Sequence, residues 1–226
     1  FGIGKPPTGS KDAYSLRRAA LGVLRIMIEN ALDLRVSPLF DKAATLYGKK
    51  LSNKDAVSDA VQFVLDRFPV KYKEEGRRPD TISAVNAIKI DMPFDFHRRV
   101  LAVESFREMP EAESLAAANK RVQNMLKGND LAKLAGTPEP ALLTEPAEKE
   151  LSDALKGLEK QLEPLIQQGE YAKVLSELAA LKKPVDKFFD EIRVMDEDPK
   201  IQQNRIILLN NLHGLFFKVA DISQLS

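Results

Sequence analysis

Cysteine and tryptophan are absent from this 226-residue chain, and histidine occurs only at His97 and His213. The lack of cysteine excludes disulfide bonds, cysteine-ligated metal sites and a cysteine nucleophile. Two isolated histidines leave little from which to build a metal centre or a Ser-His-Asp triad. The sequence has neither the ~20 unbroken apolar residues of a membrane-spanning helix nor a secretory leader. We therefore expect a cytoplasmic protein that does not bind a membrane. Because residue 1 is phenylalanine, we also expect a fragment of a longer chain.

No charge of one sign dominates the chain, whose formal net charge is +1. The distribution is uneven, however. Residues 1–110 hold 19 basic and 14 acidic side chains, a balance of +5, whereas residues 111–226 hold 15 and 19, a balance of −4. A strongly basic nucleic-acid binder usually has a larger excess. Binding to a polyanion would therefore depend on local patches of positive charge.

Apolar residues recur at the three- and four-residue spacing of helices along most of the sequence. No longer stretch alternates with the period of two that a strand requires. These patterns predict an all-α fold. The leucines of 151–165 form too short a series for a coiled coil and indicate packing inside a helix bundle. The expected helices cover approximately 16–31, 57–68, 81–88, 93–106, 111–126, 151–165, 174–181, 185–192 and 199–219, and a further one begins at 37.

Capping residues and prolines mark where the helices begin and end. Ser10 or Asp12 is expected to cap the first helix, and Ser52 with Asp55 resembles a shortened capping box. Pro164 is expected to kink or end its helix, and Pro184 to start a new one. Pro110 is the predicted domain boundary. Gly128-Asn129 is the expected end of the helix after it, and the segment 131–144 a loop.

The sequence offers little enzymatic chemistry. Gly2-Ile3-Gly4-Lys5 lacks the full spacing of a phosphate loop and no strand precedes it, so it is interpreted as part of a linker. Acidic runs such as 74–75 and 196–198 are interpreted as solvated turns. The remaining signal is a set of basic pairs, which are either solvated helix faces, internal ion pairs or phosphate contacts. The pairs are Arg17-Arg18, Arg77-Arg78, Arg98-Arg99 and Lys120-Arg121.

Five segments resemble the β subunits of the bacterial heterotetrameric (α2β2) glycyl-tRNA synthetases and occur in the order of that family. They are KDAYSLRRAALGVLRIMIE (11–29), RRPDTISAV (77–85), AAANKRVQNML (116–126), VDKFFDEIRV (185–194) and NRIILLNNLHGLFFKVADIS (204–223). The resemblance implies the C-terminal third of the subunit, with a helical body segment over 1–110 and a DALR-like anticodon-binding helix bundle over 111–226. One departure is that Lys200–Gln203 replaces the family's Ala-Leu-Arg pattern.

By the division of labour that the resemblance implies, this chain holds glycine tRNA while the α subunit attaches glycine. The fragment itself is then not catalytic and has no cofactor or metal, although the whole ligase uses ATP and Mg²⁺. The implied partners are glycine tRNA, the α subunit in an α2β2 heterotetramer and the rest of the β chain.

Positive and amide side chains are the candidates for contacting the tRNA, because unpaired bases and phosphates are recognised by such groups. In the second domain the candidates are Lys120, Arg121, Asn124, Lys187, Arg193, Asn204, Arg205 and Lys218. In the first domain they are Arg17, Arg18, Arg77, Arg78, Arg98 and Arg99. An internal ion pair of Arg205 is the alternative for that residue. Phe188, Phe189, Phe216 and Phe217 are expected to be core residues in at least three cases.

Two other functions stay open on the sequence alone. The chain could be a structural scaffold for assembly of the α and β subunits without reading the anticodon. An independent helical enzyme is disfavoured by the missing cysteine, the scarce histidine and the lack of carboxylate pairs in apolar surroundings.

Overall fold

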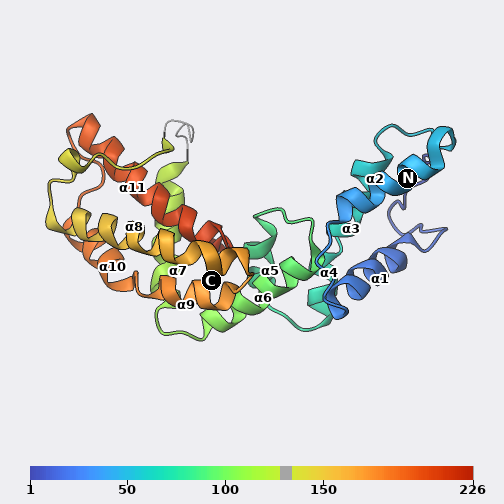
Figure 1. The fold of residues 1–226 in the computed structure, drawn as a ribbon, viewed down its shortest axis with the longest axis horizontal. Coiled ribbons are helices and arrows are strands. Elements are labelled where there is room, and N and C mark those ends of the chain that lie inside the picture. Colours follow the sequence, from blue (N-terminus) through green and yellow to red (C-terminus); the bar gives the residue numbers. More distant parts are fainter. Residues whose placement is uncertain (128–133, 226) are drawn as a thin grey trace. The chain divides into compact units, whose positions relative to one another are not determined.

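The computed structural model describes residues 1–127 and 134–225, and within these ranges the regular structure is helical (Figure 1). The one bridge of β type there joins Thr8 to Lys11. The predicted all-α fold is confirmed. The described part of the predicted loop contains a short 3-10 helix, η3 (Pro140–Leu142). The expected helix end at Gly128-Asn129 and the first residues of that loop, 131–133, lie outside the described residues.

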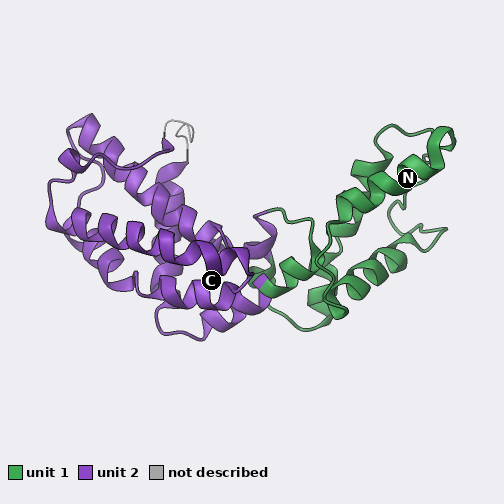
Figure 2. Ribbon diagram, in the orientation of Figure 1, with its two compact units in different colours: residues 1–82, 89–98 green, residues 83–88, 99–226 purple. Residues whose placement is uncertain are grey.

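The chain forms two compact units (Figure 2). Unit 1 comprises residues 1–82 and 89–98, and unit 2 comprises 83–88 and 99–226. Helices α5 (Pro79–Asn86) and α6 (Pro93–Arg107) contribute residues to both. Residues 99–110 thus group with unit 2, because Val103 and Phe106 are buried and the Phe106 ring lies 6.3 Å from that of Phe216. Pro110 as a domain boundary stays a prediction.

Unit 1 is organised around stacked aromatic rings. The ring centroids of Phe68 and Phe96 lie 3.9 Å apart, and Tyr72 stacks on both. All three are almost fully buried, and burial of one such side chain contributes roughly 1.5–3 kcal/mol. The helices of this unit besides α5 and α6 are α1 (Leu16–Glu29), α2 (Val36–Tyr47), α3 (Ala56–Leu65) and α4 (Phe68–Glu74), with the short η1 (Gly48–Lys50).

Unit 2 is a helix bundle in which α7 contacts α10 and α11, and α8 contacts α9, α10 and α11. Leu151, Leu155 and Leu162 of α8 are buried, which confirms the interpretation of the leucine series as bundle packing. The elements are α7 (Ala112–Leu126), α8 (Pro146–Gln167), α9 (Tyr171–Ala179), α10 (Lys182–Glu191), α11 (Pro199–Phe217) and η4 (Ile222–Gln224).

Local signals explain several helix starts and correct others. The Asp12 carboxylate accepts hydrogen bonds from the amides of Leu16 (2.8 Å) and Arg17 (3.0 Å), as expected for a cap. The predicted capping box of Ser52 and Asp55 is wrong, because Asp55 makes no side-chain cap. The Asn53 side chain instead bonds to the Asp55 amide and to Asp59.

The two internal prolines behave differently. Pro184 lies in the first turn of α10, where no hydrogen bond to a preceding carbonyl is lost. Pro164 does not end α8, which continues to Gln167. The helix continues for less than one turn after Pro164, so the missing N–H donor of this proline affects only the end of α8.

Candidate nucleic-acid interface

Helix α7 has one apolar and one polar face. Leu115 and Val122 are buried in unit 2, whereas Lys120, Arg121 and Asn124 are exposed. The last three lie on one side of the helix, since residues three and four apart are neighbours. Within the described part of the chain neither Lys120 nor Arg121 forms an ion pair. We call the exposed set Lys120, Arg121 and Asn124 the α7 face. The positive charges of its lysine and arginine are not neutralised by any described residue.

An aromatic ring supports the arginine of the α7 face. The Arg121 guanidinium carbon lies 4.4 Å from the centre of the Phe189 ring. Phe189 in turn meets the buried Phe188 edge to face, at 5.5 Å between centroids. A guanidinium over a ring gains roughly 0.5–1 kcal/mol at an exposed site. The contact therefore favours one position of the Arg121 side chain.

The other two cations near α10 differ in how far they are neutralised. The Lys187 ammonium lies 2.6 Å from a carboxylate oxygen of Glu150, whose hydrogen bond and charge raise the pKa of Lys187. Arg193 has an exposed side chain, and its backbone carbonyl accepts a hydrogen bond from Arg205. Arg193 is therefore the more available of the two.

Arg205 is buried and serves the fold. Its guanidinium pairs with the fully buried Glu148 through Nε and with Asp196 at 2.6 Å through Nη1, which also donates to the Arg193 carbonyl. Burial alone would lower the pKa of Arg205, but the hydrogen bonds and charges of Glu148 and Asp196 raise it. The internal ion pair that the sequence left as an alternative is the arrangement found.

Asn204 is buried and joins α11 to the segment before η3. Its Oδ1 accepts from the Glu139 amide at 2.7 Å, and its Nδ2 donates to the Glu139 carbonyl at 3.1 Å. One side chain thereby satisfies both backbone groups of Glu139. The candidate list is corrected here: the side chains of Asn204 and Arg205 are committed to internal partners, and we leave them out of the proposed RNA surface.

The pair Arg98-Arg99 is also engaged within the protein. Arg99 donates to the carbonyls of Lys218 (2.5 Å) and Val219 (3.1 Å), at the end of α11 where carbonyls lack helical partners. It further bonds to the Tyr171 hydroxyl at 2.8 Å. Arg98 lies 3.3 Å from Asp95 and 3.5 Å from Asp33. Both arginines act mainly as structural cations.

The two remaining pairs of unit 1 each divide into an engaged and an open member. Arg17 is half-buried and donates to the Gly9 carbonyl at 2.6 Å, whereas Arg18 is exposed. Arg77 is half-buried and lies 3.4 Å from Glu75. Among the described residues, the exposed Arg78 forms an ion pair only with Asp80, at a long distance of 3.8 Å. Exposed pairs of this kind contribute about 0–1 kcal/mol, so Arg78 stays available.

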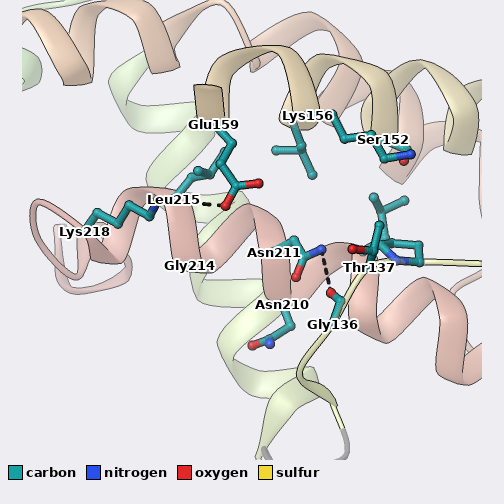
Figure 3. A pocket seen from close by; sticks show the side chains of 13 residues that line it. Gly136, Thr137, Ser152, Lys156, Glu159, Asn210, Asn211, Gly214, Leu215 and Lys218 are labelled. Atoms are coloured by element: carbon teal, nitrogen blue, oxygen red, sulfur yellow. Dashed lines mark hydrogen bonds and ion pairs between the residues drawn. The ribbon is translucent and has the colours of Figure 1, made fainter. Parts of the chain in front are cut away.

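Lys218 belongs to a pocket of about 470 Å³ that the sequence did not reveal (Figure 3). Lys156, Asn210 and Asn211 also line it and were missed as candidates. The available signal was the adjacent pair of asparagines between Leu209 and Leu212. The two asparagines bond to the carbonyls of Leu134 and Gly136 at 3.2 and 3.1 Å.

The expectation that at least three of these four phenylalanines are core residues is wrong. Phe188 and Phe216 are fully buried, but Phe189 is half-buried and Phe217 is 37% exposed.

Both histidines are half-buried and neither belongs to a metal-binding cluster within the described residues. His97 Nδ1 lies 3.0 Å from the Tyr72 hydroxyl. Burial lowers the pKa of His97, and the positive charges of Lys71 and Arg77 lower it further. Burial likewise lowers the pKa of His213, although the negative charge of Asp221 opposes this.

The described helices include none that is long and apolar enough to span a membrane.

Comparison with known proteins agrees with this architecture. Residues 1–87 match the family profile described as glycyl-tRNA synthetase beta subunit, and residues 115–219 match the DALR anticodon binding domain. The chain belongs to the glycyl-tRNA synthetase β-subunit family. The second match contains most of unit 2, including the α7 face. Neither match covers 88–114, where the predicted domain boundary lies.

Named relatives match over the whole of the present chain. A "Glycine--tRNA ligase beta subunit" of Actinobacillus pleuropneumoniae is 51% identical over 225 residues, and one of Haemophilus influenzae is 50% identical over the same length. One of Edwardsiella ictaluri is 50% identical over 226 residues. The chain spans 32% of the length of each of these relatives.

Proposed function

We propose that this chain is the tRNA-binding part of a glycine–tRNA ligase β subunit and that the α7 face contacts the anticodon region of glycine tRNA. The observation that carries the proposal is the exposed, unneutralised α7 face inside the segment that matches an anticodon-binding domain. The names of the relatives supply glycine as the amino acid.

The chemistry of the α7 face suits an unpaired RNA loop. Anticodon bases can be reached on their edges and faces, and the flanking phosphates attract cations. Arg121, held by Phe189, can stack on a base or form two hydrogen bonds to it. Asn124 can donate through Nδ2 to a base edge, while its Oδ1 accepts from the Lys127 ammonium at 2.9 Å, and Lys120 can neutralise a phosphate. Arg193 and the open cations Arg18 and Arg78 would add phosphate contacts.

In this proposal the chain holds tRNA and does not carry out the chemistry. The α subunit attaches glycine with ATP and Mg²⁺ in an α2β2 assembly, and the β chain contributes binding energy and placement of the tRNA. Because bacterial tRNA is charged in the cytoplasm, the proposal places the protein there.

The test is a binding titration of the full chain with glycine tRNA. The double variant Lys120→Ala, Arg121→Ala should weaken binding about tenfold or more and reduce the salt dependence by roughly two charges. The matched control replaces Lys160 and Lys173, which lie on α8 and α9, by alanine. Equal affinity of the two double variants would reject the α7 face. Unchanged affinity for a tRNA with an altered anticodon would reject anticodon reading.

A second candidate function, a scaffold for subunit assembly, is favoured by apolar side chains exposed on α2. Leu46 is 77%, Tyr47 61% and Leu39 47% exposed, which is unusual for large apolar residues and typical of surfaces that a partner covers. The double variant Leu39→Asp, Leu46→Asp should then abolish copurification of the α subunit and leave tRNA affinity unchanged. Retained copurification would reject the scaffold function.

A further inference from the structure

A pocket separate from the α7 face lies between α8, α11 and the segment 136–138 (Figure 3). Its volume of about 470 Å³ falls within the ~300–1,000 Å³ range of small-molecule sites. The apolar part of its lining is Leu155, Leu208 and Leu215, which are nearly buried and present a small area of aliphatic carbon to the pocket. Such a surface suits one face of a planar ring.

Gly214 leaves one side of this pocket open. It lies within α11, and a Cβ atom added to it would meet no atom within 4 Å. Its backbone is helical, so neither a left-handed conformation nor a close contact requires glycine there. Glycine costs about 1 kcal/mol relative to alanine inside a helix. The position therefore provides free space in the pocket that a larger side chain would fill.

Polar groups of several kinds converge on the same pocket. Ser152 is 2% exposed, and its Oγ has no hydrogen-bond partner among the described residues. Asn211 donates through Nδ2 to the Gly136 carbonyl, which leaves its Oδ1 as an acceptor. Glu159 faces Lys218 at 3.9 Å, a weak pair whose carboxylate is 64% exposed (Figure 3). Lys156 adds an exposed cation without an ion pair to any described residue.

We propose that this pocket binds a single nucleotide whose base carries an exocyclic amino group. The leucines would cover one face of the base, Glu159 would accept a hydrogen bond from the amino group, and Lys156 would neutralise the phosphate. Carboxylates accept hydrogen bonds from the amino group of cytosine. Uracil has a carbonyl oxygen at the corresponding position, which a carboxylate repels. Where the nucleotide is part of tRNA, the proposal rests on the proposed function and adds a second contact site on unit 2.

The first experiment fills the pocket without disturbing the helix. Gly214→Leu introduces a good helix former into the open space, and Gly157→Leu is the matched control. Gly157 is also a helical glycine with open space around it, but it does not line the pocket. Binding of glycine tRNA, CMP and UMP is measured on each full chain. We expect Gly214→Leu to weaken binding of tRNA and CMP about tenfold and Gly157→Leu to leave both unchanged.

The second experiment changes base preference without changing volume. The wild-type chain should prefer CMP to UMP by about tenfold, and Glu159→Gln should remove most of that preference because an amide can donate as well as accept. Glu163→Gln is the control, since Glu163 also approaches Lys218, at 3.7 Å, but does not line the pocket. A structural role of the Lys218 ion pairs would give both variants the same effect.

The outcomes separate the two sources of the nucleotide from each other and from the proposed function. Loss of tRNA binding in Gly214→Leu assigns the pocket to an RNA nucleotide. Loss of CMP binding alone assigns it to a free nucleotide. Failure of the wild-type chain to bind tRNA rejects the proposed function, whereas CMP binding would still support the pocket. Equal binding of tRNA, CMP and UMP by Gly214→Leu and wild type overturns the proposal.

Discussion

The α7 face and the start of α11 contain the same kinds of residue in opposite settings. Arg121 and Asn124 are exposed on α7, whereas Asn204 and Arg205 are buried at the start of α11. Arg121 lies over an aromatic ring, and Arg205 lies between two carboxylates. The difference shows that an Asn and Arg motif does not by itself indicate an RNA contact. Its partners and burial decide whether it serves the fold or remains available to a ligand.

The largest expected effect comes from breaking the buried member of this comparison. Arg205→Met removes the cation that pairs with Glu148, whose side chain is fully buried, and leaves an uncompensated charge. Losing one partner of a buried ion pair costs roughly 3–5 kcal/mol. Urea unfolding should therefore show a loss of this size in the free energy of unfolding. Arg121→Met should change it by only about 0.5 kcal/mol, as a surface substitution does.

A double variant sharpens the same test. Glu148→Gln keeps an acceptor for the Glu145 amide, which donates to Glu148 at 2.9 Å, and removes the buried negative charge. Added to Arg205→Met, it should restore part of the lost stability because no unpaired buried carboxylate remains. If the double variant is as unstable as the sum of both single changes, the two residues do not act as a pair.

The next effect concerns Asn204. Asn204→Leu removes a donor and an acceptor that satisfy both backbone groups of Glu139. Because Glu139 is itself exposed, water can replace part of this bonding, and each lost hydrogen bond should cost about 0.5–1.5 kcal/mol. Thermal unfolding should show the loss, and hydrogen exchange should show faster exchange of the Glu139 amide in particular. Exchange of that amide at the wild-type rate would contradict the assigned role of Asn204.

Much of the fold could be predicted from the sequence because local rules govern it. Helical periodicity predicted the all-α class and the buried leucines of α8, and the Asp12 cap followed from short-range hydrogen bonding. The capping box at Ser52 failed because Asn53, a neighbour of equal capping ability, takes those bonds. The capping preference identified the kind of residue that caps this helix, but not which of the neighbouring candidates does so.

The candidate site was less predictable because its deciding contacts are far apart in sequence. Glu148 precedes Arg205 by 57 residues, and Arg99 reaches a carbonyl 119 residues later. No local pattern contains such pairs. The position of Phe217 was accessible to reasoning, since it lies off the stripe formed by Leu212, Leu215 and Phe216. The pocket between α8 and α11 depends on tertiary packing and could not be derived.

The exposed member of the comparison can be tested through its aromatic support. Phe189→Leu removes the ring beneath Arg121 and leaves the guanidinium mobile, at a cost of about 0.5–1 kcal/mol of preorganisation. If the α7 face binds RNA, affinity for glycine tRNA should fall roughly two- to fivefold. Phe217→Leu, on α11, is the matched control. The same affinity for both variants would mean that the support of Arg121 by Phe189 has no part in binding.

His97 lies between these extremes, because it is half-buried with its Nδ1 3.0 Å from the hydroxyl of the fully buried Tyr72, and it gives the smallest expected effect. Burial lowers the pKa of His97 below 6.5, the positive charges of Lys71 and Arg77 lower it further, and Glu75 opposes them. The folded chain therefore prefers the neutral imidazole, and the unfolded chain takes up the proton first as pH falls. The stabilisation is complete above pH 6.5 and decreases as pH falls below that value.

His97→Gln should consequently flatten the loss of stability between about pH 7.5 and about pH 5.5, measured by urea unfolding at each pH. Some slope should remain in His97→Gln, because the pKa of His213 is also lowered and its protonation likewise reduces stability as pH falls. Replacing both histidines should remove more of the slope than either change alone. A slope that is identical in wild type and His97→Gln would mean that protonation of this imidazole is not linked to unfolding, so that a half-buried polar group can behave like the exposed residues of α7.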